Sequence, residues 1–128
     1  MQDKHLYEYA IIRIVPRVER EEFINCGIIL FCKKENYLKC KFGINQNRLI
    51  ALFPDSDIDL IQSHLKSFEN IAAGLEIGGP VALFDPPSRF RWLTAPRSTI
   101  IQTSKVHPGL GDDNENVIKK LFNSFVLD

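Results

Sequence analysis

Residues 56–75, SDIDLIQSHLKSFENIAAGL, decide the fold class that we expect for this chain. Their apolar side chains recur at spacings of three and four, which predicts an amphipathic helix lying on a sheet. Ser56 and, three residues later, Asp59 are typical of a capping box at the start of a helix. The apolar positions of this helix are Ile58, Ile61, Leu65, Phe68, Ala72 and Leu75.

Three strands are expected before this helix. Residues 6–15 are rich in aromatic and β-branched residues and largely apolar on both faces, which predicts a central strand covered on two sides. Residues 26–33 predict a second strand, where Gly27 indicates a bulge or a close backbone approach. Residues 37–42 alternate strictly between apolar and polar, which predicts a half-exposed peripheral strand. A short helix is expected at residues 45–53.

Further elements are expected after the main helix. Residues 89–94 and 98–103 predict two more strands joined by a short loop. Residues 107–111, HPGLG, are expected to be irregular because proline and glycine interrupt regular structure. Asp112 or Asp113 then caps a last amphipathic helix.

The predicted element order is β-β-β-α-β-β-α, in a single domain that spans residues 1–128. Strands on both sides of the main helix in the sequence favour an α+β fold in two layers. It would have a mainly antiparallel sheet of about five strands, with two main helices on one face. A chain of 128 residues is long enough to bury one real core.

The charge balance argues against nucleic-acid binding. The 16 Lys and Arg residues equal the 16 Asp and Glu residues, so the formal net charge is zero. Nucleic-acid binding normally needs a basic excess, because neutralising phosphates dominates the affinity. If such binding existed, Arg89 and Arg91 would contact the backbone and Trp92 would stack on bases.

The cysteines and the hydropathy pattern indicate the compartment. Cys26, Cys32 and Cys40 fall in predicted strands without C-x-x-C spacing, which indicates reduced, buried thiols in a reducing compartment. No apolar run approaches the roughly 18 residues of a membrane span, and the N-terminus lacks the features of a signal peptide. We therefore expect a soluble, cytoplasmic protein with no membrane partner.

Arg13 is the most informative single residue of the early strand, because it interrupts an apolar run near its end. A guanidinium in such a place must be paired or must bind an anion, because burying it alone is costly. One interpretation is a structural ion pair with Glu22 or Asp112. The other is that Arg13 binds an anionic ligand.

Two further segments are candidates for anion binding or acid–base chemistry. Arg97, Ser98 and Thr99 place a planar donor beside two hydroxyls, a pattern suited to a small anion or phosphate. Hydroxyls at the start of a strand also often cap backbone groups instead. His107 is a candidate acid or base, but without a nucleophile at motif spacing a structural, hydrogen-bonded histidine is the simpler interpretation.

No catalytic, phosphate-binding or metal-binding motif occurs in the sequence. GxGxxG, GxxxxGK[ST], GxSxG and HExxH are all missing. Histidines, cysteines and carboxylates never reach zinc or EF-hand spacing, so we expect no metal and no cofactor. Asp112 and Asp113 fit the start of a helix better than a cation site.

The predicted strand at residues 89–94 has one apolar and one charged face. Phe90 and Trp92 share the first face, so we expect them in the core. Arg89 and Arg91 share the second face, which we expect to be a charged surface.

Several motifs together carry a resemblance to a known family, and they extend over nearly the whole chain. They are Tyr7-Glu8-Tyr9, Arg13 with Pro16, residues 20–31, residues 92–99, Val106-His107-Pro108-Gly109 and Asp112-Asp113. These motifs resemble the bacterial family of small uncharacterised proteins of about 130 residues called domain of unknown function 3037. Its members have no assigned activity and are often encoded beside a serine/threonine kinase-like protein of the persistence-toxin class. The resemblance therefore implies a protein partner but no mechanism.

Two functions are compatible with these observations. The first is a non-enzymatic accessory or regulatory module that binds a protein partner, the kinase-like neighbour, through a surface with Arg89, Arg91, Arg97 and His107. The alternative is a small enzyme or ligand-binding domain for a phosphorylated or carboxylated metabolite. In that case Arg13 and Arg97 would clamp the anion and His107 would act as acid or base, all within about 10 Å of one another.

Overall fold

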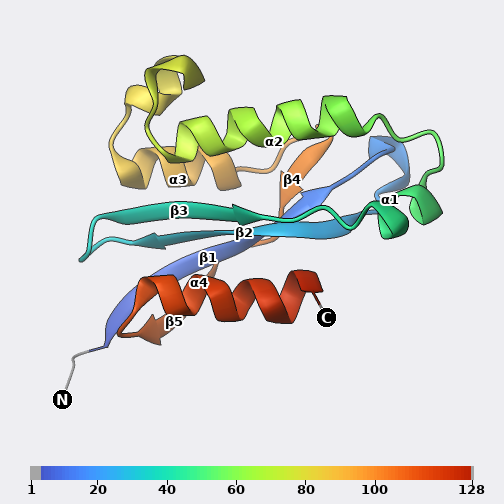
Figure 1. Cartoon of the computed structure of the whole chain (residues 1–128). Helices are drawn as coiled ribbons and strands as arrows, with labels where there is room; N and C mark the ends of the chain where they lie inside the picture. Colours follow the sequence, from blue (N-terminus) through green and yellow to red (C-terminus); the bar gives the residue numbers. More distant parts are fainter. Residues whose placement is uncertain (1–3, 128) are drawn as a thin grey trace.

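Strand β1 (His5–Ile14) lies at the centre of a five-stranded antiparallel sheet. The computed structural model describes residues 4–127 (Figure 1). Along one edge β1 pairs with β2 (Ile24–Cys32), which in turn pairs with β3 (Tyr37–Phe42). The central position of β1 and the peripheral position of β3 were both predicted and are confirmed.

Strands β4 (Ile101–Thr103) and β5 (His107–Gly111) lie end to end along the other edge of β1. β4 pairs with the last residues of β1 and β5 with the first, and the register shifts by one residue between them. Ser104 fills the gap. Its N–H donates to the Ile11 carbonyl at 2.8 Å and its Oγ accepts from the Ile11 N–H at 2.8 Å. Ser104 is the one buried polar residue of the described chain, so this edge of β1 is completed by two short strands and a side chain.

Helices cover both faces of the sheet (Figure 1). α2 (Ile58–Ala72) and α3 (Pro86–Thr94) lie on one face, and α4 (Asn114–Phe122) lies on the other and continues into the π-helical turn η4 (Asn123–Leu127). The α+β class and the antiparallel sheet are confirmed. However, the structure has three layers, because α4 covers the face that we expected to be free of helices.

The shorter helical segments lie in the connections. α1 (Gln46–Leu52) follows β3 at the predicted place. Single 3-10 turns make up the rest: η1 (Val18–Arg20), η2 (Glu76–Gly78) and η3 (Pro80–Leu83). Between residues 4 and 127, the helices are all too short or too polar to pass through a bilayer.

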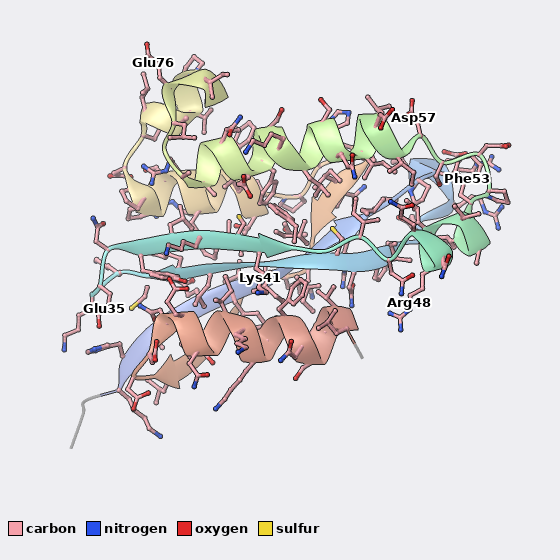
Figure 2. All side chains as sticks on the ribbon, viewed as in Figure 1. Glu35, Lys41, Arg48, Phe53, Asp57 and Glu76 are labelled. Atoms are coloured by element: carbon pink, nitrogen blue, oxygen red, sulfur yellow. The ribbon has the colours of Figure 1, made fainter. Side chains whose placement is uncertain are left out.

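Alternation along β1 builds a core on each face of the sheet. Ala10, Ile12 and Ile14 are fully buried in the cluster beneath α2 and α3. Ile11 points the other way, into the cluster that α4 closes with Ile118. Figure 2 shows side chains filling the space between the sheet and the helices on each of its faces. Because each fully buried aliphatic side chain contributes roughly 1.5–3 kcal/mol, burial on both faces makes β1 and β2 the apolar centre of the fold.

The α-helices begin at Asp or Asn residues. In each case the side-chain oxygen accepts the backbone N–H three residues later, as expected of an N-cap. The main helix begins after Asp57, so the predicted capping box at Ser56 is wrong, and the Ser56 hydroxyl donates instead to the Phe53 carbonyl at 2.6 Å. For the last helix Asp113 is the cap, as one of the two predicted possibilities stated. The four caps are Asn45, Asp57, Asp85 and Asp113.

The strand predicted at residues 89–94 is wrong, because this segment belongs to helix α3. Asp85 caps the helix and Pro86 and Pro87 occupy its first turn, where proline is favoured. In a helix, residues two apart point in different directions. Phe90 is therefore buried and stacks on Phe31, as predicted for the core, whereas Trp92 is 39% exposed, so its predicted burial is wrong.

The segments around β4 and β5 also differ from expectation. The strand predicted at residues 98–103 is shorter and covers Ile101–Thr103. Residues 107–111, predicted to be irregular, form β5. Pro108 is tolerated there because an edge strand has one unpaired side. Gly109 is required by close approach, because a Cβ at this position would lie 2.3 Å from the Tyr7 ring.

The bulge indicated by Gly27 is confirmed. The register of β1 with β2 shifts between Ile12 and Arg13, so that Cys26 is the extra residue of β2. A Cβ on Gly27 would lie 2.6 Å from the Lys41 carbonyl oxygen, which only glycine avoids.

The cysteines lie in strands without disulfides, as predicted. Cys26 and Cys32 are buried and Cys40 is half-buried. Burial raises the pKa of the Cys26 thiol to about 12, and it also raises the pKa of the Cys40 thiol well above its usual value.

Replacing Ser104 by alanine tests the gap between β4 and β5. The Ser104→Ala variant leaves the buried Ile11 N–H without its side-chain acceptor, and an unsatisfied buried donor costs about 1–3 kcal/mol. Urea unfolding should show this loss. Ser67→Ala, which removes an exposed hydroxyl bonded only within its own helix, should change stability by less than about 0.5 kcal/mol. Equal effects of the two variants would contradict the bridging role of Ser104.

Thiol accessibility should follow burial. At pH 8 Cys26 and Cys32 of the folded protein should react very slowly with a thiol reagent such as DTNB, because both are buried. Cys26, with a pKa of about 12, is in addition almost wholly protonated. In denaturing urea the cysteines should all react rapidly. Fast labelling of Cys26 in the folded protein, located by mass spectrometry, would show that the sheet opens locally.

Candidate functional site

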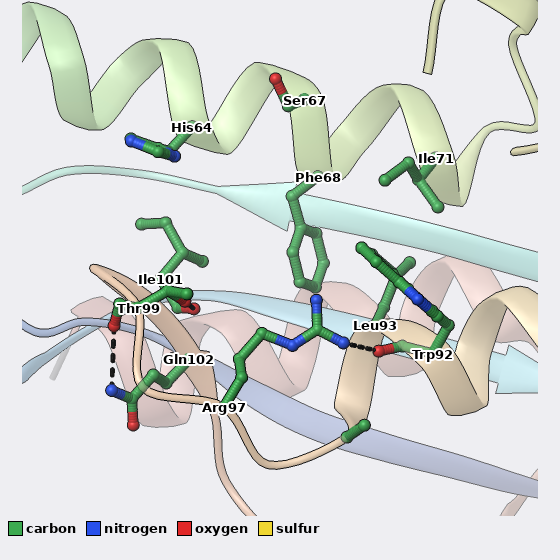
Figure 3. Close-up of a pocket in the computed structure, with 11 residues that line it drawn as sticks. His64, Ser67, Phe68, Ile71, Trp92, Leu93, Arg97, Thr99, Ile101 and Gln102 are labelled. Atoms are coloured by element: carbon green, nitrogen blue, oxygen red, sulfur yellow. Dashed lines mark hydrogen bonds between the residues drawn. The ribbon is translucent and has the colours of Figure 1, made fainter. Parts of the chain in front are cut away.

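A groove lies between α2, the end of α3, β4 and the loop that joins α3 to β4 (Figure 3). Its volume is about 190 Å³. Apolar side chains from the helices and β4 form most of it, and polar side chains lie at its rim. We call it the Trp92 groove; its lining is His64, Ser67, Phe68, Ile71, Trp92, Leu93, Ala95, Arg97, Thr99, Ile101 and Gln102.

The defining feature of the groove is Trp92 with Arg97 stacked on it. The Arg97 Cζ lies 4.0 Å from the centroid of the Trp92 ring, a distance typical of a cation–π contact. An Arg97 N–H also donates to the Trp92 carbonyl, which is drawn in Figure 3. That carbonyl belongs to the last turn of α3, where the helix dipole favours a cation. The helix end therefore holds Arg97 against an exposed tryptophan.

The hydroxyl and amide groups at the rim mainly hold the loop in place. The Thr99 hydroxyl donates to the Ile101 carbonyl at 2.7 Å, and Gln102 Nε2 donates to the Thr99 carbonyl at 2.9 Å. The interpretation that a hydroxyl in this segment caps backbone groups therefore describes Thr99. Ser98 lines an adjoining hollow of about 390 Å³, together with Arg97 and Lys105.

Arg13 lies on β1 directly opposite Gln102 of β4, but it does not line the Trp92 groove. Its guanidinium carbon is 4.1 Å from the centroid of the Phe23 ring. The expected ion pair with Glu22 or Asp112 is not formed among the described residues, and Glu22 pairs with Arg20 instead. Arg13 Nε is buried without a hydrogen-bond partner in the described chain.

His107 lies in β5, directly opposite Tyr9 of β1. Its ring centroid is 5.4 Å from that of Tyr9, which in turn stacks on Phe125 beside α4. His107 is exposed, and no described hollow near Arg97 includes it.

Arg13, Arg97 and His107 share no described hollow. Each packs against a different aromatic ring, and the hollows around Arg97 include neither of the other two. A single ligand site formed by all three therefore stays a prediction.

Arg89 and Arg91 lie on α3 but have different surroundings. Arg89 donates to the Phe84 carbonyl at 2.7 Å and to the Ala72 carbonyl at 3.5 Å, so it ties α3 to the end of α2. Arg91 is exposed, bonds to the Ser88 hydroxyl at 3.3 Å, and lines a different hollow from Arg97. Arg89 is therefore occupied by structural contacts, whereas Arg91 can reach a partner.

The polar groups of the groove do not form a catalytic arrangement. The Ser67 hydroxyl donates to the Ser63 carbonyl of its own helix at 3.2 Å, so His64 does not activate it. Across residues 4–127, no three His, Cys, Asp or Glu side chains gather as a metal ion would require.

Sequence reasoning did not find two features of this surface. His64 was not selected as a candidate residue, although it lines the groove. No function was predicted for the segment at residues 75–84, although it exposes several large apolar side chains. The sequence did contain a signal for the Trp92–Arg97 pair. Asp85-Pro86-Pro87 begins a helix, and the loop with Pro96 follows directly after that helix.

A comparison with protein families identifies the chain. The model described as "Protein of unknown function (DUF3037)" matches residues 9–126. The chain belongs to the DUF3037 family. The resemblance found in the sequence is thereby confirmed, and the match includes every residue of the Trp92 groove as well as Arg13 and His107. Comparisons of this DUF3037 protein with curated proteins and with solved structures found no match.

The Trp92–Arg97 contact can be tested by fluorescence, because Trp92 is the only tryptophan of this DUF3037 protein. Arg97→Ala removes the stacked cation and should shift the emission of Trp92. It should also lower the free energy of unfolding by about 0.5–1 kcal/mol, the usual size of an exposed cation–π contact. Arg97→Lys keeps the charge but loses the planar stack, so its effect should be intermediate. Arg91→Ala, on the helix α3 that carries Trp92, is the control and should leave the emission unchanged.

Proposed function

We propose that this DUF3037 protein is a non-enzymatic module that binds another protein through the Trp92 groove. The observation that supports this most is a partly exposed tryptophan, held by an arginine, at the rim of an apolar groove. Tryptophan and arginine are the residue types most enriched among those that dominate binding energy in protein interfaces. Because Arg97 already holds Trp92 in place, the Trp92 side chain would lose little conformational entropy when a partner binds there.

The size of the groove favours a protein partner over a small molecule. Sites for small ligands usually have volumes of about 300–1,000 Å³ and enclose most of the ligand. The Trp92 groove, at about 190 Å³, suits a single large side chain of a partner. Its base of Phe68, Ile71 and Leu93 would contact an apolar side chain.

An exposed apolar knob supports the same conclusion. It consists of Leu75, Ile77, Leu83 and Phe84, in the connection between α2 and α3. Ile77 is 82% exposed and Leu83 is 69% exposed, and clustered apolar exposure of this kind marks interaction sites. The knob joins the two helices that form one side of the groove, so both features belong to the same layer of the fold (Figure 1).

The partner that we propose is the serine/threonine kinase-like protein implied by the family resemblance, and the proposed compartment is the cytoplasm. In this role the DUF3037 protein would be an accessory or regulatory subunit. It would supply a rigid surface, while any chemistry would belong to the partner. Three of the predicted contact residues remain accessible for this role: Arg91 and His107 are exposed, and Arg97 is partly exposed.

The alternative of a metabolite-binding domain or enzyme has less support. It needs Arg13, Arg97 and His107 around one ligand, and each of these residues packs on a separate aromatic ring instead. We therefore do not propose it as a second function.

Binding to the kinase-like protein provides the test. The two purified proteins should co-elute from a size-exclusion column at micromolar concentration. Trp92→Ala should weaken binding by about 2 kcal/mol or more, which is about 30-fold, as for a central interface residue. Isothermal titration calorimetry measures this change.

Ile50→Ala is the matched control, because Ile50 is an exposed apolar residue on α1, outside the groove. It should leave the affinity unchanged. Separate elution of the wild-type proteins would refute the proposed partner. An unchanged affinity of a folded Trp92→Ala variant would refute the groove as the contact site, and Trp92→Phe provides a second, milder variant.

A further inference from the structure

A second and larger hollow lies at the end of the molecule where β1 begins and the β2–β3 turn is located. Its volume is about 750 Å³. Three separate parts of the chain form it: the start of β1, the end of β2 with its turn, and the first half of α3. Figure 2 marks Glu35 in this turn. We call it the basic hollow; its lining is Lys4, His5, Leu6, Glu8, Phe31, Lys33, Lys34, Pro87 and Arg91.

Positive charge dominates the lining. Lys4, Lys33, Lys34 and Arg91 are permanent cations, and Glu8 is the one carboxylate among the lining residues. The nearby Glu35 is occupied, because its Oε1 lies 3.0 Å from His5 Nε2. In a chain of zero net charge, this excess is a local feature and not a general property of the surface.

The lysines of the hollow are not used by the fold. Lys4, Lys33 and Lys34 make no side-chain hydrogen bond or ion pair with any described residue. This differs from Lys39, which pairs with Glu115, and from Lys66, which pairs with Glu69. The three free lysines can therefore each pair with an incoming anion without breaking an existing contact.

The floor of the hollow is apolar and partly open to solvent. Leu6 lines it and is 62% exposed, and Leu110, its direct cross-strand neighbour on β5, is 65% exposed. Pro87 adds an apolar surface from α3. Arg91, also from α3, lines the hollow opposite the start of β1. Such a combination of cations and exposed leucines fits a ligand with both carboxylates and an apolar side chain.

The same lining argues against a nucleic acid as the occupant. Proteins that bind single-stranded nucleic acid stack the bases on exposed aromatic rings. Apart from the His5 imidazole, the lining has one aromatic ring, that of Phe31. It is buried against Phe90 and cannot stack on a base. Aliphatic floors instead suit leucine-like side chains of a polypeptide.

We propose that the basic hollow binds an acidic polypeptide segment that carries an apolar side chain. The carboxylates pair with Lys4, Lys33, Lys34 and Arg91, while the apolar side chain contacts Leu6 and Leu110. This site shares no lining residue with the Trp92 groove, so it does not depend on the function proposed for that groove.

The experiment uses a short, fluorescently labelled glutamate-rich peptide with leucine at its centre and the full-length protein. Fluorescence anisotropy should show binding that weakens as salt rises toward about 0.15 M, because exposed charges are increasingly screened. The double variant Lys33→Glu and Lys34→Glu should bind at least about tenfold more weakly, since it places like charges against the peptide. Leu6→Ser should weaken binding of this peptide but not of one with glycine in place of leucine.

A matched control carries the same change of charge elsewhere. Lys105→Glu with Lys119→Glu alters two exposed lysines outside the basic hollow and should leave the affinity unchanged. Circular dichroism checks that all variants are folded. Trp92→Ala should also bind the peptide normally, which separates this site from the Trp92 groove.

Several results would overturn the inference. They are no peptide binding by the wild-type protein, equal losses in the two charge-reversed variants, and tighter binding of a single-stranded oligonucleotide than of the peptide. Complete competition by inorganic phosphate at matched ionic strength would also overturn it, because it would indicate a site for simple anions.

Discussion

The paired hydrogen bonds between Ser104 and Ile11 join two short strands into one edge of the central strand. Without them, β4 and β5 would leave a buried N–H and carbonyl of β1 unsatisfied at the point where the register shifts. Both proposed binding surfaces lie next to this edge. β4 supplies one wall of the Trp92 groove, and β5 places Leu110 beside the floor of the basic hollow. A single serine thus keeps two surfaces in a fixed relation to the same sheet.

Aromatic rings hold the candidate functional cations of this fold. Arg13 packs on Phe23 and Arg97 on Trp92, while His107 packs on Tyr9. A cation–π contact stabilises each of the two guanidinium groups, and for Arg13, whose Nε is buried without a hydrogen-bond partner among the described residues, it takes the place of an ion pair. These contacts place the three side chains on three separate aromatic rings.

Much of the fold could be predicted from the sequence, because several segments have a period that matches their structure. Residues 6–15 and 37–42 show strand patterns, and the main helix shows spacings of three and four. α3 was missed because the aromatic and arginine residues after Asp85-Pro86-Pro87 also suit a strand, and this error placed Trp92 in the core. β5 was missed because its proline and glycine are tolerated only through pairing with β1. Arg97 could be selected from the sequence as a candidate, whereas the basic hollow could not, because its lysines come from separate segments.

The order of the strands along the chain also determines when the sheet can be completed during synthesis. β1 is among the first elements to be made, but the strands that cover one of its edges lie at residues 101–111. Until that region has been synthesised, the central strand has one edge without hydrogen-bond partners, a state prone to pairing with other chains. α4, which closes one core, follows still later. The sheet can therefore be completed only after residues 101–111 have been made, and a chain that ends before residue 101 would leave one edge of its central strand unpaired.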